Sequence, residues 1–344
     1  MAERITSIQV AERAGVSQSA VSRVFTPGAS VSSKTQEKVR KAATELGYRP
    51  NVLARAMVSG KSRMIGLVVA YLENYFYPEA VEKFSNVLQE RGYHVLIFMA
   101  SQTADNIDGV MEEILDYQVD GIIMASAELS SELSNRCQMS GVPVVLFNRS
   151  QDLKGISSVT SDNFAGGRKV AEFFLAAEHS RIAYIAGWEG ASTQRDREAG
   201  FLAGLQAAGQ SLYSRDVGNF DIETAKQAAR NLFGDPKEKR PDAVFVANDH
   251  MAIAVLDVLR HEMNLSVPGD VSVIGFDDVP PASWAAYDLT TVRQRANRMV
   301  DESVATLLNK IENRALPAEQ IAIDCPLIVR GSARIPQGWE NERL

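Results

Sequence analysis

From Met64 onward, short apolar runs alternate with stretches of helical spacing, and this alternation restricts the possible folds more than any other feature of the chain. We expect strands over the apolar runs Ile65–Ala70, His94–Ala100, Gly121–Ala125, Val142–Phe147, Ile182–Ala186, Ala243–Ala247, Val271–Phe276 and Ile321–Leu327. We expect helices over Pro78–Arg91, Asn106–Gln118, Ala165–Ala177, Arg195–Ala208, Ile222–Phe233, His250–Glu262 and Gln294–Glu312. Strand, helix and strand in this order predict an α/β fold with parallel sheets and crossover helices.

The length of this region indicates more than one sheet. Val, Ile and Leu are nearly continuous in the expected strands, as in sheets that are covered on both faces. Roughly 280 residues are many for one such sheet, so we expect two α/β lobes with a boundary near Ser161. The last helix and strand are expected to return to the first lobe.

Charge divides the chain into two unlike parts. The whole sequence has a formal net charge of −7, which taken alone argues against binding to nucleic acid. Residues 1–63, however, hold eleven Lys or Arg and four Glu, a balance of +7, which leaves −14 for the remainder. The basic N-terminal part is suited to meet phosphates, whereas the acidic remainder is not.

The basic part has the pattern of a helix-turn-helix. Two short helical patterns, Ile8–Ala14 and Ser17–Phe25, meet at Gly15-Val16, and a third runs from about Ser32 to Leu46. Thr6 with Gln9 predicts a capping box on the first helix, Ser17 caps the second, and either Ser32 or Ser33 caps the third. Ile8, Val10, Ala11 and Ala14 are expected to form the apolar face of the first helix. We therefore expect a DNA-binding head over residues 1–48.

The second helix carries candidate base-reading residues. With Ala20, Val21 and Val24 facing inward, the side chains of Gln18, Ser19, Ser22 and Arg23 remain outside. Short polar and forked side chains at the start of such a helix can reach base edges and phosphates in the major groove. The alternative for each is a solvated helix face.

Residues 49–63 are expected to form a hinge helix and linker. Asn51 can cap a helix over Val52–Ser59, which is too short to be stable alone in water. Leu53 and Met57 lie four residues apart on one face, and apolar side chains of this kind can wedge between base steps in the minor groove.

These N-terminal motifs together resemble the head and hinge of the lactose-repressor (LacI/GalR) family of bacterial transcription regulators. The motifs are Val10-Ala11, Ala14-Gly15-Val16-Ser17, Val21-Ser22-Arg23-Val24, Val31-Ser32, Lys38-Val39, Gly47-Tyr48, Pro50-Asn51 and Ala54-Arg55. The resemblance implies that the second helix reads the major groove and that the hinge helix enters the minor groove with a leucine wedge, whose place Met57 takes here. The expected DNA contacts are Thr6, Ser17, Gln18, Ser19, Ser22, Arg23, Asn51, Ala54 and Met57.

The body, residues 64–344, resembles the periplasmic sugar-binding fold that such regulators carry as effector domain. The markers are Gly66-Leu67, Asp162-Asn163, Gly166-Gly167, Arg197, Gly200-Phe201, Ala247-Asn248-Asp249, Gly275-Phe276-Asp277-Asp278 and Leu289-Thr290-Thr291-Val292. The resemblance implies an effector site at Asp162, Arg197, Asn248 and Asp277, in the crevice at the carboxyl ends of the strands. Carboxylates, amides and a forked guanidinium suit sugar hydroxyls, and Arg195 beside Arg197 would suit an acidic sugar.

Aromatic side chains are the remaining candidates for the effector site. Tyr71, Phe76 and Phe220 lie where rings can stack on a sugar, although core packing is an equal alternative for Phe76 and Phe220. Asp162 and Asn248 can also serve only as helix caps.

The function expected from these features is that of an allosteric transcriptional regulator, usually a repressor, controlled by a sugar or carbon metabolite. A homodimer without a tetramerising heptad segment is expected on a pseudo-palindromic operator, with the effector acting as inducer or as corepressor.

A solute-binding protein would explain the body, but the sequence shows no secretory signal and has the basic head. An enzyme is the third alternative, but no acid, base and nucleophile set is found. Cys137, Cys325 and the four histidines show no metal-ligand spacing, so we expect a cytoplasmic, nucleoid-associated protein with reduced thiols and no metal or cofactor.

Overall fold

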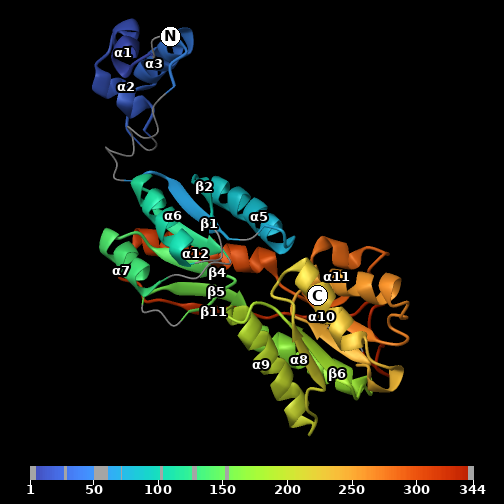
Figure 1. Cartoon of the computed structure of the whole chain (residues 1–344). Coiled ribbons are helices and arrows are strands. Elements are labelled where there is room, and N and C mark those ends of the chain that lie inside the picture. Colours follow the sequence, from blue (N-terminus) through green and yellow to red (C-terminus); the bar gives the residue numbers. More distant parts are fainter. Residues whose placement is uncertain are drawn as a thin grey trace. The chain divides into compact units, whose positions relative to one another are not determined.

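The computed structural model describes residues 5–26, 29–49, 61–70, 72–100, 104–125, 130–151 and 155–339. The chain divides into two compact units, Met1–Arg63 and Met64–Leu344 (Figure 1).

The N-terminal unit contains three short helices, each of which begins at a side-chain cap. They are α1 (Ser7–Ala14), α2 (Gln18–Val24) and α3 (Ser33–Leu46). Thr6 and Gln9 form the expected capping box on α1, and the Ser17 side chain accepts a hydrogen bond from Ala20 N. Ser32, not Ser33, caps α3, because its Oγ accepts from Thr35 N. The capping serines and threonine thus satisfy backbone N–H groups that the first helical turn leaves without partners.

A small apolar core holds these helices together. Val10, Val21 and Val39, one from each helix, are completely buried and form the centre of the cluster. The prediction that Ile8 belongs to this face is wrong, because Ile8 is 53% exposed. A core with one fully buried valine per helix leaves the outer face of α2 free for other contacts.

The first lobe of the larger unit contains a six-stranded parallel sheet. Its order is β11-β5-β4-β3-β1-β2. The strands are β1 (Met64–Val69), β2 (His94–Met99), β3 (Gly121–Ala125), β4 (Val144–Phe147), β5 (Ser157–Ser161) and β11 (Gln320–Ile323). The helices α5 (Phe76–Glu90), α6 (Ala104–Asp116) and α7 (Ser131–Ser140) follow β1, β2 and β3 as crossovers.

The second lobe repeats this architecture. Its sheet has the order β12-β10-β9-β8-β6-β7, parallel except that β12 runs antiparallel to β10. The strands are β6 (Ile182–Ala186), β7 (Ser214–Val217), β8 (Ala243–Val246), β9 (Ser272–Asp277), β10 (Thr290–Arg293) and β12 (Leu327–Ile328). The helices are α8 (Asn163–Ala176), α9 (Ser192–Ala207), α10 (Ile222–Phe233) and α11 (Asp249–Asp257), the last continued by a π-helical turn over Val258–Glu262.

The chain passes between the two sheets at three places. It leaves the first sheet after β5, returns after β10 through α12 (Ala296–Glu312) to β11, and crosses again before β12 (Figure 1). The expected single strand Ile321–Leu327 is therefore wrong: it is two short strands in different sheets. Pro326, which has no N–H to donate, lies in the break between them.

Several elements lack a strong apolar pattern and were not expected from the sequence. These are the serine-rich β5, the polar β7, the short β10 and the helix α7. Ser157 and Ser158 of β5 are buried all the same, because strands on either side pair with it. The expected fold class, a helix-turn-helix head with a two-lobed parallel α/β body, is confirmed.

Helices α8 and α9 pack unusually closely, and glycines make this possible. A Cβ at Gly200 would lie 1.9 Å from the carbonyl oxygen of Phe164, and one at Gly167 would lie 2.0 Å from that of Arg197. Backbone atoms cannot move aside as a flexible side chain can. These glycines therefore hold the helix that carries Arg197 against the helix that begins the second lobe.

We predict that Gly200→Ala lowers the free energy of unfolding by about 2–3 kcal/mol, because the added methyl group overpacks the α8–α9 contact. Urea denaturation followed by circular dichroism measures this change. Gly109→Ala in α6 is the matched control, since nothing lies within 4 Å of the added Cβ, and it should be neutral or stabilising. Equal effects of the two substitutions would contradict the close-packing explanation.

Candidate functional site

The exposed face of α2 presents the polar residues that were expected to read DNA. Gln18, Ser19, Ser22 and Arg23 are all exposed. The Gln18 amide donates to Ser7 Oγ at 3.0 Å, which ties the start of α2 to the start of α1. Thr6 and Ser17 are also exposed while their oxygens cap these helices. The structure thus brings the six described candidates to the first turns and outer face of α1 and α2.

Four expected contact residues are not among the described residues. Asn51, Ala54, Met57 and Tyr71 lie outside the described residues, as does the expected hinge helix Val52–Ser59.

In the larger unit, Arg197 is the centre of a buried polar cluster. Its side chain is 2% exposed, and its Nε donates to Asn163 Oδ1 at 2.9 Å while Nη1 donates to the carbonyl oxygen of Ala247 at 2.6 Å. The guanidinium carbon lies 3.7 Å from the centre of the Phe276 ring. Burial lowers the pKa of Arg197 from its ordinary value, and the nearby charge of Asp277 opposes that shift. A guanidinium held by so many fixed groups has one defined orientation.

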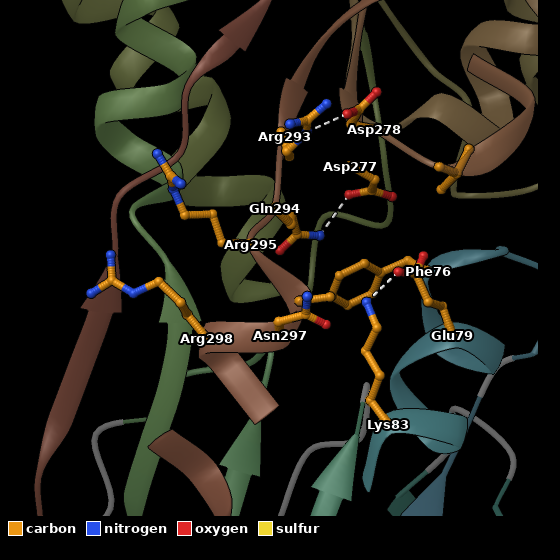
Figure 2. A pocket seen from close by; sticks show the side chains of 12 residues that line it. Phe76, Glu79, Lys83, Asp277, Asp278, Arg293, Gln294, Arg295, Asn297 and Arg298 are labelled. Atoms are coloured by element: carbon orange, nitrogen blue, oxygen red, sulfur yellow. Dashed lines mark hydrogen bonds and ion pairs between the residues drawn. The ribbon is translucent and has the colours of Figure 1, made fainter. Parts of the chain in front are cut away.

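Asp277 is the acceptor that faces Arg197. Their closest atoms, Nη2 and Oδ1, are 3.4 Å apart. Asp277 also accepts from Gln294 Nε2 at 2.7 Å, a bond that Figure 2 shows. It accepts from Asn74 Nδ2 at 2.9 Å as well. Asp277 and Asp278 have φ of 125° and 59°, a region that residues with a side chain rarely adopt. Such strain is typical of ligand-binding positions, where surrounding contacts hold it in place.

The two lobes meet directly around this cluster. Asn74 belongs to the first lobe, so its bond to Asp277 crosses between lobes. Arg149, which follows β4, donates from Nη1 to Thr193 Oγ1 of α9 at 2.9 Å, and Ser150 N donates to Ser192 Oγ at 3.0 Å. Movement of one lobe against the other must break or exchange these hydrogen bonds.

Asp162 and Asn248 occupy helix caps. Asp162 Oδ1 accepts from Ala165 N at 2.9 Å at the start of α8, and Asn248 Oδ1 accepts from Met251 N at 3.0 Å at the start of α11. In this structure the side-chain oxygens of both residues therefore serve as helix caps, as the alternative interpretation of the sequence had it. Asn248 nevertheless lies next to the cluster, because Arg197 donates to the carbonyl oxygen of the preceding residue, Ala247.

The aromatic candidates are buried, and the second arginine lies elsewhere. Phe76 is 2% exposed and stacks on Phe147 with 5.9 Å between ring centres, and Phe220 is 8% exposed within the core. Arg195 is exposed and donates to the carbonyl oxygen of Gly190 at 3.2 Å. The suggestion that Arg195 and Arg197 form a pair of guanidiniums in the site is therefore wrong.

A cavity of about 320 Å³ opens beside the cluster. Phe76, Asp277 and Gln294 form its inner part, and the first turn of α12 forms its outer part (Figure 2). This volume lies at the lower end of the range for small-molecule sites.

Sequence reasoning missed Asn74, Asn163 and Gln294 as members of the cluster. Gln294 directly follows β10, a strand that was not expected from the sequence, so its place at the carboxyl end of a strand could not be recognised from the sequence. Asn74 lies in a loop and carries no local signal. Its role appears only when the two lobes are placed together.

A second buried carboxyl, Asp249, lies near the cluster. It accepts from Thr291 Oγ1 at 2.6 Å and from Val279 N at 3.0 Å. Burial, and then the charge of Asp277, hold the pKa of Asp249 well above its usual range, and the two bonds oppose this only in part. Asp249 therefore keeps its proton in the folded protein at pH values where the unfolded chain has lost it.

We predict that this carboxyl makes the protein less stable as pH rises. Above about pH 4 the unfolded group is ionised while the folded one remains protonated, so each further pH unit lowers the free energy of unfolding by up to about 1.4 kcal/mol. Urea denaturation at pH 5, 6 and 7 measures the slope, and Asp249→Asn should flatten it. The same slope in both proteins would show that Asp249 titrates normally.

Comparisons with known proteins agree with this architecture. Residues 8–51 match the model of the lacI family of bacterial regulatory proteins, and residues 171–333 match a periplasmic binding protein-like domain. The chain is 31% identical over 334 residues to the ribose operon repressor of Escherichia coli K12, covering 95% of this chain and 99% of the relative. It is 29% identical over 335 residues to the transcriptional repressor PurR of Vibrio campbellii, covering 94% and 97%.

Solved structures show the same likeness over both units. The regulator CelR in complex with cellobiose is 30% identical with a TM-score of 0.72, covering 96% of this chain and 100% of that one. The lac repressor dimer bound to operator and the anti-inducer ONPF is 27% identical with a TM-score of 0.86, covering 96% and 99%. No helix among the described residues is long and apolar enough to span a membrane. With a capped three-helix head and a two-lobed body around a buried polar cluster, the chain belongs to the lacI family of bacterial regulatory proteins, DNA-binding transcription regulators that carry a ligand-binding domain.

Proposed function

We propose that this protein is a repressor that binds a pseudo-palindromic operator as a homodimer and responds to a small sugar-related effector. Residues 1–48 form the DNA-binding head, residues 49–63 the hinge, and residues 64–344 the effector and dimerisation part, with the lobe boundary near Ser161. Relatives named as repressors and the cellobiose complex of a similar regulator support this assignment. The protein acts in the cytoplasm on the nucleoid and is not an enzyme.

In this proposal the head reads the operator through α2. Core packing uses Val21 and Val24, which leaves Gln18 and Arg23 exposed toward solvent or DNA. An arginine can fork onto a guanine, and a glutamine can bond an adenine, in the major groove. Thr6, Ser17, Ser19, Ser22, Asn51, Ala54 and Met57 complete the proposed DNA contacts.

The body senses the effector through the cluster around Arg197 and Asp277. The observation that carries this proposal is the hydrogen bond from Asn74 to Asp277, because it joins the two lobes within the cluster. A ligand hydroxyl that takes the place of Asn74 on Asp277 changes a cross-lobe contact, and so can bias the lobe arrangement. Tyr71, Phe76, Asp162, Phe220 and Asn248 are the further proposed effector contacts.

The coupling between the two sites is reciprocal. If the effector weakens operator binding by a given factor, the operator weakens effector binding by the same factor. A corepressor would strengthen both. Whether the effector weakens or strengthens operator binding depends on which arrangement of the two lobes it favours.

We predict that Arg23→Ala weakens operator binding by about 10- to 100-fold, because a specific contact to a base contributes about 1–3 kcal/mol. Fluorescence anisotropy at fixed salt measures the dissociation constants for the operator and for random duplex. Arg13→Ala is the matched control, since it removes the same charge from an exposed arginine that pairs with Glu45. Equal losses on operator and random DNA would remove Arg23 from the reading surface.

We predict that Asp277→Asn reduces the effect of the effector on operator affinity at least tenfold, because the amide loses a charged acceptor while keeping nearly the same shape. Operator binding is titrated with ribose and with cellobiose, the sugars that the names of the relatives suggest. A variant that responds like the natural protein would discredit the proposed cluster. A natural protein that responds to no sugar would discredit the sugar class.

A further inference from the structure

The cavity beside the cluster has a basic outer part. Lys83 of α5 and Arg293, Arg295 and Arg298 around the start of α12 line it, and Figure 2 shows these side chains around the open space. Phe76 contributes an apolar surface at its inner end, where Asp277 and Gln294 belong to the proposed effector cluster. One cavity thus joins a site for polar hydroxyls to a set of cationic groups.

The carboxylates near the cavity are too few for its cations. Arg293 and Arg330 share Asp278, and Arg295 and Arg298 share Asp324. Lys83 pairs with Glu79, and Arg197 faces Asp277. Four basic and three acidic side chains line the cavity itself, and their ion-pair partners Arg197, Arg330 and Asp324 bring the set to six basic and four acidic. The net charge of this set is positive although the whole chain is acidic.

Two further features concern the donors around the cavity. The Nε atom of Arg295 is buried and has no hydrogen-bond partner among the described residues. Helix α12 runs for 17 residues, has no side-chain cap and no acidic residue in its first turn. The N–H groups at such a helix start carry partial positive charge, which adds to that of the arginines.

We propose that this cavity binds the anionic group of the effector, a phosphate or carboxylate carried by a small organic molecule. This inference rests on the proposed effector site and narrows its ligand to phosphorylated or acidic metabolites. The organic part occupies the inner end, against Phe76 and within reach of Gln294. The anionic group lies among Arg293, Arg295 and the first turn of α12, where forked guanidiniums can bond its oxygens in pairs.

The test compares matched ligands on the full-length protein. Isothermal calorimetry at constant ionic strength measures binding of glucose, gluconate, glucose 6-phosphate and inorganic phosphate, and the same panel is run with ribose and ribose 5-phosphate. We expect at least one organic anion to bind at least tenfold more tightly than its neutral counterpart. Gluconate and the sugar phosphates distinguish a carboxylate from a phosphate as the preferred group.

The variant Arg295→Gln/Arg298→Gln should lose that preference by tenfold or more. Arg298→Gln alone, at a side chain that is 57% exposed, serves as a second variant that is expected to fold. The control is Arg136→Gln/Arg230→Gln, which removes two ion-paired arginines whose side chains are 45% and 39% exposed. Neither lines the cavity, so this variant should keep the preference.

Four outcomes would overturn the inference. They are neutral sugars that bind as tightly as their anionic counterparts, a preference unchanged in the double variant, inorganic phosphate that binds as tightly as the organic anions, and no binding of any organic anion. If the protein responds to neutral sugars through Asp277 but does not prefer anions, the proposed function stands and only the inference of an anion site is rejected.

Discussion

The contact between Arg197 and Asp277 is the interaction on which the rest of the body depends. Both side chains are almost fully buried, and removal of one partner from such a pair commonly costs about 3–5 kcal/mol. Asn163, Gln294, Asn74 and the carbonyl of Ala247 satisfy the remaining donors and acceptors. These groups are already removed from water and oriented, so a ligand that binds as proposed exchanges one hydrogen-bond partner, Asn74, within an otherwise fixed polar cluster.

The head could be predicted nearly residue by residue because its signals are local. A capping box needs only residues three positions apart, so Thr6 and Gln9 predict the start of α1 from the sequence alone. Ile8 was misplaced because helical spacing shows which residues share a face but not how far the neighbouring helices cover it. The same limit applies to β5, whose serines are buried only because β4 and β11 lie on either side.

The sequence predicted the positions of the central residues of the candidate site, but not all of the residues that contact them. Arg197 and Asp277 were expected from a family resemblance and from the end of a strand, and they do meet. Asn74 was not expected, since its partner lies 203 residues away and in the other lobe. Asp162 and Asn248 show the converse: a polar residue after a strand fits both a ligand site and a helix cap, and the local sequence does not separate these roles.

The interleaved course of the chain also affects how the protein is made. β11 completes the edge of the first sheet beside β5, yet it follows β5 by about 160 residues, after most of the second lobe. During synthesis, β5 therefore remains an unpaired edge strand of the first lobe until these further residues, up to β11, have left the ribosome. The serine side chains of β5 suit this unpaired state. They make the exposed edge less prone to aggregate with other nascent chains than valine or isoleucine side chains would.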